Sequence, residues 1–234
     1  MKRIRYIVSF GILISIFVFN GCSSVKKAED TGWKLVFSDN FKRDKLGKNW
    51  KVINGNWIVK DGYLRGNGTL ICIKEFFKKD QDGCIRLEFE AASDVQPFLF
   101  FKNRPKFKVV LSDMSSFIHA LPLEKNKNPI NSGYFFQFGG YNNQKNQIRK
   151  VGLTAKADAK PDKLIVVDKR HKIVVENDNG LLRLIVDGKL ALEHKDKSPL
   201  ISAGQSRIGF YFYTAAKLYK VKVYIKQRTD LFAK

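Results

Sequence analysis

The side chains best suited to chemistry are aromatic rings and amides that gather between residues 134 and 149. The group comprises Phe135, Gln137, Tyr141, Asn142, Asn143, Asn146 and Arg149. The flat face of a sugar ring stacks on aromatic side chains, and its hydroxyls need partners that donate and accept hydrogen bonds. These residues are therefore candidates for binding a saccharide. The alternative is that residues 139–146 form only a polar hairpin loop.

Alternation along the run from Tyr134 to Phe138 predicts which of these side chains share a face. Successive side chains of a strand point to opposite faces. Phe135 and Gln137 therefore share one face. Tyr134, Phe136 and Phe138 share the other, which we expect to face the core.

Two carboxylates, Glu88 and Glu90, share a strand face with Arg86. Paired carboxylates act as acid and nucleophile in many glycosidases, so these two are the candidates for catalysis. The alternative is a solvated strand face whose charges are balanced by lysines. The histidines are scattered, at positions 119, 171 and 194, and no zinc motif, calcium loop or phosphate loop is present. The sequence predicts no cofactor.

Two cysteines of the main body, Cys72 and Cys84, each fall in a strand-like run, over residues 69–74 and 84–92. We expect these runs to be antiparallel neighbours, which would allow a cross-strand disulfide. The alternative is two separate thiols.

The N-terminus has the pattern of an export signal. Basic residues precede an apolar stretch of residues 6–19, which is short for a membrane span. Gly21-Cys22 then resembles the lipobox of bacterial lipoproteins, which implies cleavage before Cys22 and acylation of that residue. The sequence thus predicts a signal peptide (1–21), a lipidated tether (22–32) and a domain (33–234) held at the cell envelope, at the outer membrane or cell surface rather than the inner membrane. A plain secreted protein is the alternative.

Beyond the signal, the dominant sequence period is two, which is typical of β-strands. Alternating runs include residues 85–90, 172–176, 181–186, 190–193, 207–213 and 218–226. Turn dipeptides separate such runs, among them Asp61-Gly62, Asn67-Gly68, Asn179-Gly180 and Asp187-Gly188. Many short strands at this spacing predict an all-β sandwich or jelly roll of two antiparallel sheets. The alternation is interrupted over residues 112–132, which we expect to form a long loop outside the sheet.

Several segments resemble domains of the concanavalin A-like lectin and glucanase superfamily. The segment from Phe37 to Leu64 contains Asp39-Asn40-Phe41, Arg43, Trp50 and the hairpin Trp57 to Leu64. Residues 131–140 resemble the corresponding strands of 3-keto-disaccharide hydrolases, and residues 182–190 resemble a laminin-G-like hairpin.

The resemblance implies a concanavalin A-like jelly roll that binds carbohydrate. It equally implies a glycoside-processing hydrolase or a module that recognises protein, because the superfamily hosts all three. Laminarinase-like members cut glycans with a Glu-x-Asp-x-x-Glu strand in the concave groove. Here only Glu88 and Glu90 match that strand, and the last glutamate is missing. Some relatives bind a structural calcium, for which Asp39 and Asn40 are the candidates.

Composition limits the partners. The chain has 234 residues, with 43 Lys and Arg against 22 Asp and Glu, for a net charge of +21. Hydrophobic residues make up 44% of it, which excludes long disorder. The charge favours a polyanion, and an anionic polysaccharide fits a protein of the envelope. No nucleic-acid-binding module is visible. The alternative is that the lysines only reflect genome composition.

Overall fold

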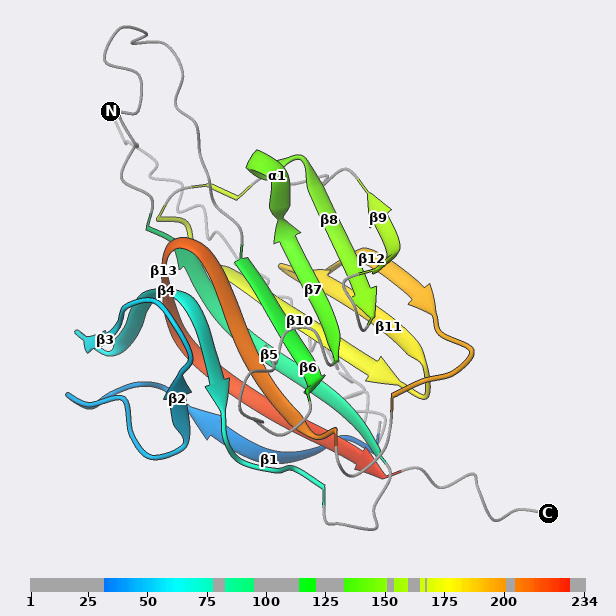
Figure 1. Ribbon diagram of the computed structural model, residues 1–234, viewed down its shortest axis with the longest axis horizontal. Helices are drawn as coiled ribbons and strands as arrows, with labels where there is room; N and C mark the ends of the chain where they lie inside the picture. The colour runs from blue at the N-terminus through cyan, green and yellow to red at the C-terminus, as the bar shows by residue number, and fades with distance from the viewer. Residues whose placement is uncertain are drawn as a thin grey trace, which may run out of the picture. The chain divides into compact units, whose positions relative to one another are not determined.

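The computed structural model describes residues 32–77, 83–94, 114–120, 133–150, 154–159, 165–166, 168–200 and 205–227. These residues form thirteen strands and one helix of four residues, α1 (Gly140–Asn143) (Figure 1). The all-β prediction is therefore confirmed. The predicted signal peptide, Cys22 and most of the tether lie outside the described residues. No helix in the described part of the chain is long and apolar enough to cross a membrane.

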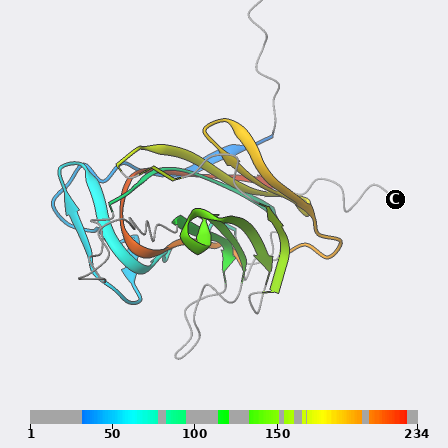
Figure 2. The same cartoon turned by 90° about the horizontal axis from the view of Figure 1, so that it is seen from above.

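The strands form two antiparallel layers that face each other (Figure 2). The back layer contains β1 (Lys34–Asp39), β5 (Gly83–Ser93), β10 (His171–Asp178), β11 (Leu181–Val186) and β12 (Lys189–Lys195). The front layer contains β2 (Trp50–Val52), β3 (Trp57–Lys60), β4 (Tyr63–Cys72), β6 (Met114–Ala120), β7 (Tyr134–Gly139), β8 (Lys145–Lys150) and β9 (Thr154–Ala159).

One long strand, β13 (Arg207–Gln227), belongs to both layers. Its first half pairs with β4 and β6 in the front layer, and its second half pairs with β5 and β1 in the back layer. In Figure 1 it runs from orange, over a bend, to red. The sequence indicated two runs here, 207–213 and 218–226. They form one strand because the small residues Thr214, Ala215 and Ala216 let it bend from one layer to the other without a turn.

The core fills the space between the layers. Each strand contributes alternate residues to it, such as Leu87 and Phe89 from β5, and Phe210 and Phe212 from β13. Tyr134, Phe136 and Phe138 of β7 also belong to this core, which confirms the predicted alternation along that strand.

The predicted hairpin turns are confirmed at Asp61-Gly62, Asn179-Gly180 and Asp187-Gly188. Both residues of each dipeptide have positive φ, as a type I′ turn requires. Asn67-Gly68 is different, because it lies inside β4. Gly68 has φ 86° and packs so closely on the chain at Asn54 that a Cβ would lie 2.5 Å from the Asn54 carbonyl oxygen. Glycine at this position lets two backbone segments pack closely together. The predicted turn at Asn67-Gly68 is wrong.

The expected long loop over residues 112–132 is wrong in its first part. Residues 114–120 form β6, which pairs with β13 on one side and β7 on the other. Residues 121–132 lie outside the described part of the chain.

The expected disulfide between Cys72 and Cys84 is not formed. Their strands are not neighbours, because β13 lies between β4 and β5. Cys72 is buried in the core, and burial raises the pKa of its thiol to about 11. The Cys84 sulfur accepts a hydrogen bond from the backbone N–H of Asn179 at 3.2 Å.

Candidate functional site

The sequence placed a saccharide site on the outer face of the front layer. The register does bring its members together, because Phe135 lies opposite Arg149, and Gln137 lies opposite Gln147. However, Phe135 is only 4% exposed and Gln137 only 6%. Phe135 belongs to a second apolar cluster, together with Ile71, Phe117 and Ala120. The expectation that these two side chains form an open sugar platform is therefore wrong: both faces of β7 are covered.

The amides around α1 are used by the chain itself. Asn143 donates to the carbonyl of Ile165 at 2.8 Å and accepts from its N–H at 2.9 Å. Asn146 is buried and accepts from the N–H of Gly139 at 3.1 Å. These bonds hold the α1 turn in place, which fits the alternative of a polar turn better than a ligand site.

The remaining predicted residues of this group divide in two. Arg149 is half-buried, donates to Gln147 at 3.0 Å and places its guanidinium 5.8 Å from the centre of the Phe135 ring. The side chains of Tyr141 and Asn142, like that of His119, lie outside what the structure describes.

The proposed calcium ligand Asp39 already has partners on both carboxylate oxygens. Arg43 donates to both oxygens, at 2.6 and 2.7 Å, and the Trp50 indole donates at 2.8 Å. The backbone N–H of Phe41 donates at 2.9 Å. The carboxylate is therefore neutralised by an arginine, which contradicts its role as a calcium ligand. Within the described residues, no cluster of three or more His, Cys, Asp and Glu could hold a metal ion.

His171, one of the scattered histidines, is fully buried at the start of β10. Its Nδ1 lies 3.0 Å from a carboxylate oxygen of Asp187. Burial of Asp187 raises its pKa, but hydrogen bonds from the Lys172 N–H and from His171 together lower the pKa below its ordinary value. The pair joins the β11–β12 turn to the start of β10, so it is a structural contact.

Glu88 and Glu90 lie on β5, on the outer face of the back layer. Glu88 forms an ion pair with Arg86 at 3.1 Å, and Glu90 forms one with Arg170 at 3.3 Å.

A hollow of about 120 Å³ opens at these glutamates. It is lined by Glu88, Phe89, Glu90, Lys172, Lys220 and Lys222. The register explains the arrangement, because Glu90 lies between Lys172 of β10 and Lys220 of β13, while Lys222 lies opposite Glu88. Three neighbouring strands thus present a mixed charged surface to solvent.

A bulge in β13 shapes the rim of this hollow. The register between β13 and β5 shifts between Leu218 and Lys220, so the extra residue, Tyr219, points outward beside Lys220. The Arg170 guanidinium lies over the Tyr219 ring, 3.6 Å from its centre. The centre of the Tyr63 ring lies 5.5 Å from the centre of the Tyr219 ring. This stack fixes Arg170 next to Glu90.

Unlike Arg86 and Arg170, the lysines of the hollow are not paired with its glutamates. In the part of the chain that the structure describes, the ammonium groups of Lys172, Lys220 and Lys222 form no ion pair, since the nearby glutamates pair with Arg86 and Arg170. Arg86 also pairs with Glu176 at 3.6 Å. The lining of the hollow itself has three lysines against two glutamates and therefore a formal excess of positive charge.

Comparison with solved structures identifies the fold. A galectin-like protein of unknown function from Bacillus subtilis aligns with 84% of this chain and all of its own, at 15% identity and a TM-score of 0.58. The Emp47p carbohydrate recognition domain aligns with 82% of this chain and 97% of its own, also at 15% identity and a TM-score of 0.58. The GH16 endo-β-1,3(4)-glucanase SCLam aligns with 85% of this chain and 92% of its own, at 11% identity and a TM-score of 0.55.

The fold is a concanavalin A-like jelly roll. The predicted fold is thereby confirmed, and at these identities the likeness concerns the fold alone. No protein-family model and no curated protein matches the chain.

Within this concanavalin A-like fold, the sequence analysis gave no site role to Lys172, Lys220, Lys222, Arg170 or Tyr219. Part of the signal was present, because the alternation over residues 218–226 places Lys220 and Lys222 on one face. The bulge at Tyr219 and the pairing of β13 with β5 carry no sequence signature, so the hollow could not be assembled from sequence.

Proposed function

We propose that this protein is a carbohydrate-binding jelly roll and that it contacts the glycan at the hollow on the back layer. The observation that carries the proposal is the gathering of open donors and acceptors in that hollow. Glu88 and Glu90 can accept hydrogen bonds from sugar hydroxyls, and Lys172, Lys220 and Lys222 can donate them. The carbohydrate recognition domain of Emp47p and the glucanase SCLam, which share the fold, support a glycan as ligand.

Binding is favoured over hydrolysis. A glycosidase needs one carboxylic acid that stays protonated and one free carboxylate at a set separation. Here both carboxylates are paired with arginines and stand on a solvated strand face. A receptor needs only fixed hydrogen-bonding groups, which these ion pairs provide.

A glycan array tests the proposal. We expect the wild-type protein to bind, and the double variant Glu88→Ala/Glu90→Ala to lose about tenfold or more in affinity, because two charged acceptors are removed. Tyr213→Ala is the matched control, since Tyr213 is 61% exposed on the first half of β13 and away from the hollow. An equal loss in the control, or release of reducing sugar by the wild type but not by the Glu variant, would contradict a receptor at this place.

We further propose that the domain is held at the bacterial envelope by acylation of Cys22. The basic, apolar and Gly21-Cys22 segments of the N-terminus support this proposal. A lipid anchor would keep the hollow close to envelope or extracellular polysaccharide.

A further inference from the structure

We propose that the hollow selects saccharides that carry a negatively charged group, a carboxylate or a sulfate, over neutral ones. This inference rests on the proposed function of the same site. It concerns the three lysines of the hollow, Lys172, Lys220 and Lys222, and the two glutamates between them.

The first argument is that the glutamates of the hollow have ion-pair partners within the protein, whereas its lysines have none among the described residues. Each glutamate has an arginine partner, Arg86 for Glu88 and Arg170 for Glu90. Arg86 is shared with Glu176, which has a second partner in Arg183. The lysine ammonium groups have no carboxylate partner among the described residues. The carboxylates are thus neutralised from within the protein, and the positive charge of the lysines remains available to a ligand.

The second argument is the placement of the lysines. Lys172 stands on β10, and Lys220 and Lys222 stand on β13, so the three approach the hollow from both sides of β5. Adjacent strands are about 4.8 Å apart, so the two sides are separated by roughly 10 Å at the backbone. Lysine carries its charge on a flexible four-carbon stem, which lets groups on both sides reach one anion.

The third argument is that, among the described residues, the lining of the hollow contains no aromatic ring open to a ligand. Neutral sugars are held largely by stacking on aromatic faces. The Tyr219 ring at the rim is covered by the Arg170 guanidinium at 3.6 Å, and Phe89, which lines the hollow, is 2% exposed. A neutral sugar would gain only hydroxyl contacts here. An acidic sugar would gain those contacts and charge-assisted hydrogen bonds to the lysines.

The test compares polymers that differ only in charge. Polygalacturonate is paired with its carboxyl-reduced form, and dextran sulfate is paired with dextran, against the full-length protein in detergent. We expect at least one charged polymer to bind at least about tenfold more tightly than its neutral partner. This is the gain in affinity expected from one charge-assisted hydrogen bond. The two pairs distinguish a carboxylate from a sulfate.

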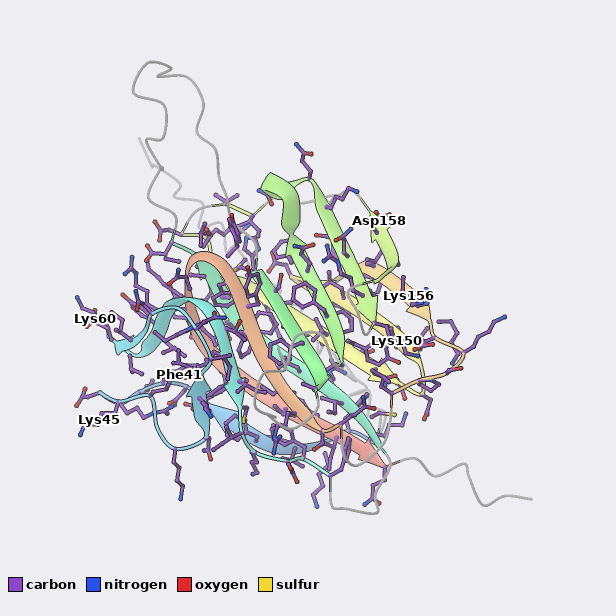
Figure 3. All side chains as sticks on the ribbon, in the orientation of Figure 1. Phe41, Lys45, Lys60, Lys150, Lys156 and Asp158 are labelled. Carbon is purple, nitrogen blue, oxygen red and sulfur yellow. The ribbon has the colours of Figure 1, made fainter. Side chains whose placement is uncertain are left out.

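Variants separate the hollow from the general positive charge. Lys220→Gln/Lys222→Gln should lower affinity for the charged polymer about tenfold. The control is Lys45→Gln/Lys156→Gln, which changes net charge equally at two exposed side chains away from the hollow, one between β1 and β2 and one on β9 of the front layer (Figure 3). It should change affinity less than about twofold, as expected for screened, distant charges.

Each outcome decides the matter. Equal losses in both double variants would mean that diffuse charge binds the polymer and would overturn the inference. Equal binding of charged and neutral partners, abolished by Glu88→Ala/Glu90→Ala, would overturn it while the proposed function stands. Binding of no glycan at all would remove both.

Discussion

Asp39 shows how a few residues organise the start of the domain. Its carboxylate accepts from Arg43, from Trp50 and from the N–H of Phe41, whose φ of 54° is unusual for a residue with a side chain. These four residues are all part of the pattern by which the sequence resembles concanavalin A-like domains. The pattern therefore marks a structural junction between β1 and β2, with no ligand required.

We expect Asp39→Asn to lower the free energy of unfolding by about 2 kcal/mol near neutral pH, because Arg43 and Trp50 lose a charged acceptor. Burial raises the pKa of Asp39, but the hydrogen bonds from Arg43, Phe41 and Trp50 together hold it below its ordinary value of 3.8. A carboxyl whose folded pKa is lowered stabilises the protein above its unfolded pKa, and this contribution is lost as pH falls through the folded value.

Urea unfolding at about pH 7 and about pH 3 measures this effect. The gap in stability between wild type and Asp39→Asn should narrow in acid. A gap of the same size at both pH values would show that the network owes nothing to the charge of Asp39.

At the residue scale, sequence reasoning identified types of side chain better than their surroundings. It found Glu88 and Glu90, which do line the hollow, yet it did not find the lysines that line the hollow with them. It found Phe135 and Gln137 on one face, yet that face is covered. Alternation determines the face of a strand on which a residue lies, but what covers the face depends on contacts from distant parts of the chain.

At the scale of elements, strands and hairpin turns were predicted well because both have local causes. β10, β11 and β12 lie where the alternating runs and the dipeptides Asn179-Gly180 and Asp187-Gly188 indicated. The failures are non-local. Cys72 and Cys84 were assigned to neighbouring strands, but a strand more than 120 residues further along the chain lies between them.

Gly68 and Gly188 provide a test of what glycine does in these elements. Both have positive φ, 86° and 78°, but a Cβ at Gly68 would meet backbone at 2.5 Å, whereas nothing lies within 4 Å of one at Gly188. We expect Gly188→Ala to cost about 1 kcal/mol, the conformational term alone. Gly68→Ala should cost about 3 kcal/mol, because the β2–β3 segment must also move.

Thermal or urea unfolding of the two variants gives the comparison. Similar losses at the two positions would mean that the close approach of Gly68 to Asn54 adds nothing to stability.

At the scale of the whole molecule, two inferences have different support. The jelly roll is confirmed by its strands and by proteins of the same fold. The attachment to a membrane depends on the sequence pattern before residue 23.

The anchor can be tested in growing bacteria with a clickable fatty-acid analogue. The wild-type protein should become labelled and sediment with membranes, because acyl chains on Cys22 hold it at a bilayer. Cys22→Ser should remove the label, while the neighbouring control Ser23→Ala should keep it. Labelling that persists in Cys22→Ser would rule out lipidation at this residue.

The position of β13 has a consequence for biogenesis. It is the last of the described strands in chain order, yet it lies in the middle of the front layer and beside β5 in the back layer. A ribosome-bound nascent chain therefore cannot complete either layer until residues 207–227 have emerged. If the proposed export signal is used, both layers would still lack this strand while the earlier part of the chain enters the translocation channel.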